Sequence, residues 1–176
     1  MKRLMWCAGF ALAAASVTSM TARADDAPKP VSDEDFVMKA SAAGMAEVNF
    51  GKLAVEQSSS AEVKKFAQHM VDDHSKANAE LLKVADKDKI TPAEKMDAKH
   101  QQMFTKLAGL KGAEFDREYI ASQLADHKEA VALFKSESNH GNNDDLKAFA
   151  TKTLPTLEHH LKMVENISGE KGSKDK

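Results

Sequence analysis

The stretch Phe66–Leu82, FAQHMVDDHSKANAELL, has the spacing of an amphipathic helix. With its flanks, its apolar residues recur every three or four positions and form one stripe that must pack against other helices. The stripe consists of Val63, Phe66, Ala67, Met70, Ala77, Leu81 and Val84. His74 lies in the middle of this stripe, where an apolar side chain is expected. The stretch therefore predicts a packed helix that carries one titratable group on its buried face.

Residues 1–24 have the features of a secretory signal peptide. A basic start is followed by a mostly apolar run that is too short for a comfortable membrane span. Ala22-Arg23-Ala24 fits the A-x-A cleavage motif, so we expect cleavage after Ala24 and a periplasmic or secreted mature chain. The single cysteine, Cys7, lies inside the signal. The mature chain therefore lacks disulfides and thiols.

The mature chain is expected to contain one domain, residues 32–167, between a flexible leader, 25–31, and a disordered tail, 168–176. The whole sequence has a formal net charge of −2, and its acidic and basic residues are interleaved. We expect no nucleic-acid binding, because a basic footprint is missing. No apolar run after the signal is long enough to cross a membrane. The sequence leaves protein partners and oligomeric state open.

Capping signals divide the domain into four long helices and one shorter helix. Ser32 precedes the first, which is expected over 33–57, and the Ser59–Glu62 capping box precedes the second, which ends near Asp88. Thr91-Pro92-Ala93-Glu94 is a helix start that predicts a crossover helix ending near Leu110. The last two helices are expected over 113–138 and from 144, after the cap Asn143, to 167.

The helix order predicts an all-α, ferritin-like four-helix bundle. A short turn joins the first two long helices and another joins the last two, so each pair is expected to form an antiparallel hairpin. The crossover helix between the second and third long helices can carry the chain from one end of the bundle to the other. Two hairpins joined in this way give the ferritin-like connection.

Each long helix has one ionisable residue near mid-length on its apolar stripe. Along the hairpins, Glu47 lies roughly 18 Å from its turn and His74 roughly 21 Å, at about 1.5 Å per residue. His127 and His160 have similar depths in the second hairpin. An unpaired carboxylate in an apolar core would cost several kcal/mol. We therefore expect the four side chains to converge at the centre of the bundle.

A glutamate and three histidines suit one Zn²⁺, Cu²⁺ or Fe²⁺ ion. We interpret Glu47, His74, His127 and His160 as candidate ligands. Met70, Asn78 and Met163 lie about one helical turn from a candidate ligand and could support it. Asp116 and Tyr119 could be buried polar partners, although a plain interhelical hydrogen bond explains Asn78, Asp116 and Tyr119 equally well. The two thioethers would favour copper, but methionines at this spacing are far more often part of the apolar core than ligands. Asp73 and Asp126 are interpreted as solvent-facing, or at most as supports for the ligands, and His100 as a surface residue.

Several motifs together resemble the DUF4142 family of exported bacterial proteins with a ferritin-like four-helix domain. The resemblance rests on Gly44–Val48 with Gly51–Ala54, Phe66–His74, Phe115–Tyr119, Asp126-His127 and Leu154–Leu161. It covers nearly all of the mature chain. Glu47, His74, His127 and His160 occupy motif positions of the family. The resemblance implies export and the bundle fold, and it brings no settled activity.

The main hypothesis is an exported periplasmic protein that binds one transition-metal ion and acts in binding or envelope stress rather than in turnover. A first alternative is a non-catalytic interaction protein in which the same cluster is a structural polar network. A second is a metal-dependent oxidase. Ferritin-like di-iron oxidases need several inward glutamates, whereas the stripes here supply only Glu47. Neither an open coordination position nor a substrate path is visible in the sequence.

Overall fold

The fold is known from a computed structural model that describes residues 31–169. This part of the chain is all helical, as predicted: α1 is Asp33–Gln57, α2 Ala61–Asp88, α3 Ala98–Ala108, α4 Gly112–His140 and α5 Asp144–Ser168. The predicted signal peptide 1–24, nearly all of the leader and the tail beyond 169 lie outside the described residues. Ser168, placed in the tail by the sequence, is the last residue of α5.

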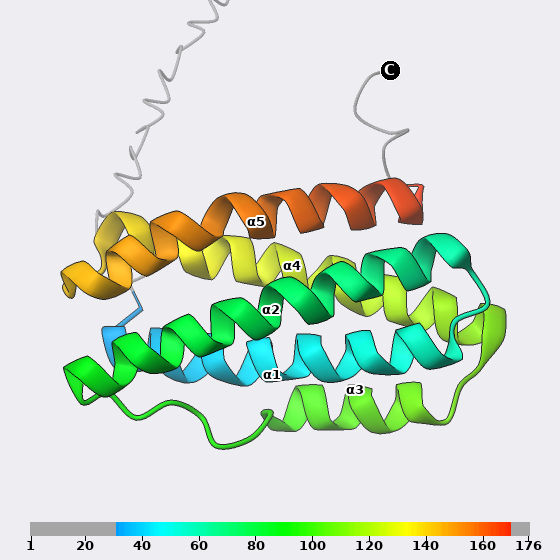
Figure 1. The fold of residues 1–176 in the computed structure, drawn as a ribbon, viewed down its shortest axis with the longest axis horizontal. Coiled ribbons are helices and arrows are strands. Elements are labelled where there is room, and N and C mark those ends of the chain that lie inside the picture. The colour runs from blue at the N-terminus through cyan, green and yellow to red at the C-terminus, as the bar shows by residue number, and fades with distance from the viewer. Residues whose placement is uncertain (1–30, 170–176) are drawn as a thin grey trace, which may run out of the picture.

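Two antiparallel hairpins form the four-helix bundle (Figure 1). One hairpin is α1 with α2, and the other is α4 with α5. The hairpins pack through α1 against α4 and through α2 against α5. The shorter α3 lies outside the four, along α1, and returns the chain to the end where α4 begins. This arrangement confirms the predicted bundle with a crossover. No helix of residues 31–169 is both long and apolar enough to cross a membrane.

The crossover helix begins later than the sequence predicted. The prediction of a helix start near Thr91 is wrong, because α3 starts at Ala98 and its N-cap is Asp97, whose side chain accepts a hydrogen bond from the His100 amide at 3.0 Å. The preceding segment runs along α1 instead, where the Ala93 amide donates to the Ser41 hydroxyl at 2.8 Å. The α2 cap is also displaced, since Ser60 rather than Ser59 caps Val63.

Two apolar clusters fill the bundle, and the histidines lie between them along the helices. The first contains Phe50, Phe66 and Phe115, and the second contains Phe36, Phe134 and Phe149. On each of α2, α4 and α5, one histidine separates residues of the first cluster from residues of the second. Met70 and Leu81 flank His74 on α2, Leu124 and Phe134 flank His127 on α4, and Leu157 and Val164 flank His160 on α5. The core is therefore a polar layer enclosed by two apolar ones.

Gly51 permits the close approach of α1 to α2. A Cβ at this position would lie 2.8 Å from Val71 Cγ2 and 3.0 Å from the carbonyl oxygen of Ala67. We expect Gly51→Ala to destabilise the fold by about 1–3 kcal/mol, because the backbone of α2 must move to accept the methyl group. Urea unfolding would measure the change. Gly109→Ala is the control, since a Cβ there would make only ordinary contacts, from 3.5 Å outward. Equal stability of Gly51→Ala and the wild type would contradict this account.

Candidate metal centre

Three histidines from three helices meet at the centre of the bundle. His74 comes from α2, His127 from α4 and His160 from α5, and their exposed fractions are 7%, 1% and 1%. The ring centroids of the three pairs are 5.4–5.6 Å apart. One ring nitrogen of each residue lies within 4.8 Å of the other two. Three nitrogens at this spacing can bind one ion, since a zinc–imidazole bond is about 2.0–2.1 Å long.

Hydrogen bonds fix which nitrogen of two histidines can act as a ligand. His127 Nδ1 lies 3.0 Å from the carbonyl oxygen of Gln123, which only accepts, so Nδ1 carries the proton and Nε2 the lone pair. His160 Nε2 donates to the Asp73 carboxylate at 3.1 Å, which leaves the lone pair on Nδ1. Within residues 31–169, His127 Nε2, His160 Nδ1 and His74 Nε2 are buried and have no hydrogen-bond partner. These three atoms are the candidate donors.

Burial keeps all three imidazoles neutral near pH 7. Loss of hydration lowers the pKa of His127 from 6.5 to about 4, and the Gln123 carbonyl offsets this only in part. Burial, followed by the neighbouring His127, lowers the pKa of His160 to about 4 despite the Asp73 carboxylate. Burial also lowers the pKa of His74 well below its ordinary value, and the neighbouring His127 and His160 lower it further. A metal therefore meets deprotonated donors without having to displace protons.

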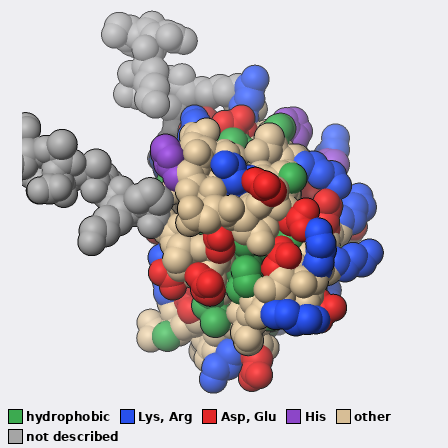
Figure 2. Space-filling model, turned by 90° about the vertical axis from the view of Figure 1, so that its left-hand side faces the viewer, with side chains coloured by type: hydrophobic (Ala, Val, Ile, Leu, Met, Phe, Trp, Pro, Cys, Tyr) green, Lys and Arg blue, Asp and Glu red, His purple; other side chains and the backbone are tan. Residues whose placement is uncertain are grey.

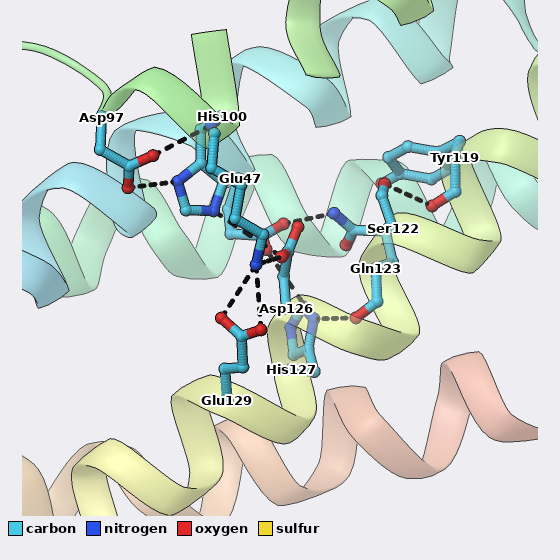
Figure 3. A network of polar contacts seen from close by, with 10 residues as sticks. Glu47, Asp97, His100, Tyr119, Ser122, Gln123, Asp126, His127 and Glu129 are labelled. Atoms are coloured by element: carbon cyan, nitrogen blue, oxygen red, sulfur yellow. Dashed lines mark hydrogen bonds and ion pairs between the residues drawn. The ribbon is translucent and has the colours of Figure 1, made fainter. Parts of the chain in front are cut away.

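Glu47, the fourth ligand predicted from the sequence, lies beside the three histidines but is hydrogen-bonded to Gln123. Its Oε2 accepts a hydrogen bond from Gln123 Nε2 at 2.6 Å (Figure 3). Its Oε1 lies 3.9 Å from His127 Nδ1, which is the protonated nitrogen rather than the donor nitrogen. Glu47 is not part of the close group of ligand atoms formed by the three histidines. Its predicted role as a ligand stays a prediction.

Burial raises the pKa of Glu47 from 4.5 to about 8, and the bond from Gln123 only moderates the shift. The folded state therefore holds a proton that the unfolded chain has lost, so this residue's contribution to stability falls as the pH rises from about 4.5 to 8. Glu47→Gln, a neutral mimic, removes that fall. We expect the Tm of this variant, relative to wild type, to be higher at pH 9 than at pH 5 in metal-free protein. Exposed Glu56→Gln on the same helix is the control, and parallel pH profiles for Glu47→Gln and wild type would refute the shift.

A charged network that the sequence reasoning missed adjoins Glu47 (Figure 3). Asp126 was interpreted as solvent-facing and His100 as a surface residue, but their exposed fractions are only 8% and 7%. Lys99 donates to Asp126 at 3.0 Å and to Glu129 at 2.9 Å, and His100 Nδ1 bonds Asp97 Oδ2 at 2.6 Å. Asp126 Oδ1 also lies 3.7 Å from His100 Nε2. Through Lys99 and His100, the network links the start of α3 to Asp126 on α4.

The supporting residues chosen from the sequence occupy different places. Met70 and Met163 pack with the first apolar cluster. Tyr119 is fully buried against Phe66 and Phe115. Asp116 accepts from the Ser59 hydroxyl at 2.7 Å, near the α1–α2 turn and about 16 Å along α4 from His127. Of these five residues, only Asn78 lines, together with His74, a cavity between the helices of the bundle. Asp73, for which the sequence left a supporting role open, accepts a hydrogen bond from the candidate ligand His160 at 3.1 Å.

One buried carboxylate lies away from the centre. Glu137 on α4 has an exposed fraction of 2% and, with His140, forms a Glu-x-x-His sequence near the end of the helix. Burial and the nearby Asp33 raise its pKa to about 7. Glu137 lies ten residues beyond His127, so it is separated from the histidine group by about 15 Å along the helix. It does not contribute to the centre.

Solved structures with the same fold include a copper protein and two proteins of another uncharacterised family. A structure described as CopM in the Cu(II)-bound form matches with a TM-score of 0.66 and 16% identity, over 79% of this chain and 97% of that one. A DUF305 fragment from Deinococcus radiodurans has a TM-score of 0.68 and 14% identity, over 80% and 99% of the two chains. A putative secreted DUF305 protein from Streptomyces coelicolor has a TM-score of 0.65 and 14% identity, over 80% and 92%.

At these identities the structural neighbours establish the fold alone. Comparison with curated proteins gave no match. A family model described as a domain of unknown function, DUF4142, matches residues 18–167. This range contains all five helices except the last residue of α5, and it includes the three histidines. The chain therefore belongs to the DUF4142 family, as its sequence motifs indicated.

Proposed function

We propose that this protein binds one transition-metal ion, copper or zinc, through His74 Nε2, His127 Nε2 and His160 Nδ1. The observation that carries the proposal is that the three buried imidazoles converge, with one ring nitrogen of each within 4.8 Å of the others, and that each has a buried nitrogen with no hydrogen-bond partner among the described residues. Buried polar atoms without partners are rare because each costs about 1–3 kcal/mol. A shared metal ion would satisfy all three at once. Imidazole nitrogens suit copper and zinc.

The same observation argues against a purely structural polar network. In such a network we would expect both nitrogens of each imidazole to be hydrogen-bonded. His127 and His160 instead use one nitrogen each for Gln123 and Asp73, and their other nitrogens have no partner in the described part of the chain. This is the pattern of metal-binding histidines, in which an outer hydrogen bond orients the ring. CopM, which shares the fold, has been solved with Cu(II) bound.

The proposed role is metal binding outside the cytoplasm, in the periplasm or as a secreted protein. The predicted signal peptide supports export, and one structural neighbour is described as a putative secreted protein. The donors are neutral and buried, which suits storage, buffering or delivery of an ion. No observation at the centre favours turnover over binding, so the oxidase alternative has no specific support.

Metal titration of protein purified without a histidine tag tests the proposal. Metal-free protein is titrated with Zn²⁺, Cu²⁺ or Fe²⁺, and bound metal is counted by elemental analysis. We expect one equivalent of Cu²⁺ or Zn²⁺ and a rise in Tm, since free metal at a hundred times its Kd stabilises by about 2.7 kcal/mol. His74→Ala should lose the metal and the Tm response, whereas exposed His69→Ala on the same helix should keep both. The absence of stoichiometric metal under every loading condition would overturn the proposal.

Glu47→Gln decides whether the carboxylate is a fourth ligand. If the three histidines suffice, this variant keeps one equivalent of metal with an affinity close to wild type. If the affinity falls as far as it does for His74→Ala, Glu47 turns away from Gln123 to bind the ion, as the sequence predicted.

A further inference from the structure

A cavity of about 920 Å³ adjoins the candidate metal centre. It lies among α1, α2, α4 and α5, and Glu47, His74 and His127 are part of its wall. Exposed residues of α1, of the start of α3 and of α4 also line it, so it opens to solvent on that side. Its volume falls within the range of small-molecule pockets, which in helical bundles occur between helices. His160 is not among the lining residues, and it is held by Asp73 on another side.

Small side chains on facing helices create this space. Ala43 on α1, Ala77 on α2 and Ala130 on α4 all line the cavity, and none reaches far into it. Part of the wall is formed by large apolar side chains: Leu81, Leu133, Phe134, Phe149 and Leu157. The cavity therefore suits a ligand whose body is apolar.

The rim of the cavity is charged. Lys39, Lys99 and Lys135 line it together with the acidic Asp97 and Glu129. Lys99 is paired with Glu129 and Asp126. Figure 2 shows the end of the bundle where α1 and α5 begin, with hydrophobic side chains between acidic and basic ones. Three carboxylates of the lining, Asp97, Asp126 and Glu129, balance the three lysines, so any preference of the cavity for an anion must come from the metal ion.

The charge at the centre calls for an anion. Three neutral imidazoles contribute no charge to balance a divalent ion in a buried layer, and the carboxylate bonded to the group, Asp73, balances only one of its two charges. Glu47 is bonded to Gln123 and lies 3.9 Å from the protonated nitrogen of His127. Zinc held by three protein ligands binds a further ligand at its fourth position. His74 and His127 are part of the cavity wall, so the cavity is the side from which we expect a further donor to approach the ion.

We infer that the cavity binds a small organic anion, a monocarboxylate with an apolar chain, whose carboxylate oxygen completes the coordination of the metal ion. The inference rests on the proposed metal binding and names the class of ligand that the same centre takes. The metal selects the carboxylate, and the leucine and phenylalanine side chains of the wall select the chain. The protein then binds metal and carboxylate cooperatively, because each improves the site for the other.

A chain-length series tests the inference on zinc-loaded protein. Acetate, butyrate, hexanoate and octanoate are titrated calorimetrically into zinc-loaded and metal-free protein. We expect the affinity to rise roughly threefold to fourfold for each methylene group that becomes buried, and metal-free protein to bind each acid far more weakly. An affinity that does not change with chain length, or that is equal with and without zinc, would overturn the inference.

Filling the cavity provides a matched pair of variants. Ala130→Leu adds a side chain to the cavity wall on α4, whereas Ala121→Leu adds the same atoms at an exposed position of the same helix. Both should keep one equivalent of zinc. Ala130→Leu should lower octanoate affinity by about tenfold or more while affecting acetate little, and Ala121→Leu should match wild type. Unchanged octanoate binding in Ala130→Leu refutes the inference. Ala43→Leu, on the α1 wall, replaces this variant should it not fold.

The two proposals fail in different ways. Wild-type protein without stoichiometric metal rejects the metal centre itself. Protein that binds one zinc ion but shows a flat carboxylate series keeps the metal centre and rejects only the organic anion. A flat series together with loss of metal in Glu47→Gln assigns the fourth position to Glu47.

Discussion

Replacing His127 with alanine is expected to lower the affinity for copper or zinc by more than about a hundredfold, since loss of an outer partner of a ligand alone costs 10–100-fold. His127 is 1% exposed, and its protonated nitrogen is fixed by the Gln123 carbonyl at 3.0 Å. Removing it leaves two nitrogens, which cannot hold an ion against water. Competition with a chromophoric chelator would measure the affinity of wild type and variant.

The control is His159→Ala, which removes an exposed imidazole next to His160. It should bind metal as wild type does. Circular dichroism and the urea midpoint of metal-free His127→Ala establish that the variant is folded. A folded variant that keeps wild-type affinity would remove His127 from the centre and would leave too few donors for the proposed site.

The second large effect concerns the acid stability of the metal-free protein. His127 has a pKa of about 4 when folded and about 6.5 when unfolded. Between these values the unfolded chain binds more protons, so this residue costs stability as the pH falls from 6.5 to 4. The shift corresponds to about 3 kcal/mol at pH 4 and below. His127→Phe removes this cost. We expect its stability relative to wild type to rise by this order as the pH falls.

Urea unfolding of both proteins at pH 7, 5.5 and 4.5 measures this difference. The change in side-chain size alters the free energy of unfolding by an amount that does not depend on pH. It therefore does not affect how the difference between variant and wild type changes across the series. The comparison also cancels the opposite contribution of Glu47, whose raised pKa favours the folded state in acid. A constant difference between the two proteins across the series would show that His127 titrates normally and is not buried as described.

The sequence predicted the fold well because helix caps and apolar stripes are local signals. Ser32 and Asn143 cap α1 and α5 as expected, through bonds to Asp35 and Leu146. The start of α3 was mispredicted because Thr91-Pro92-Ala93-Glu94 satisfies the rules for a helix start, while a contact distant in sequence, Ala93 to Ser41, holds this segment against α1. Local patterns cannot reveal such a contact.

The candidate centre was predicted by depth along the helices, and depth alone cannot give direction around a helix. It placed His74, His127, His160 and Glu47 at one height, and all four are buried there. It could not show that Glu47 turns towards Gln123 or that Asp73 reaches His160. His100 and Asp126 were missed because α3, which covers Asp126, lies outside the four-helix pattern from which the stripes were identified.

The positions of the three histidines along the chain set the order of events during biosynthesis. His74 belongs to the first hairpin, while His127 and His160 belong to the second. An ion held by all three would link the two halves of the molecule, and a nascent chain lacking α5 could not retain it. The proposed metal binding would then have to follow completion of the polypeptide through α5.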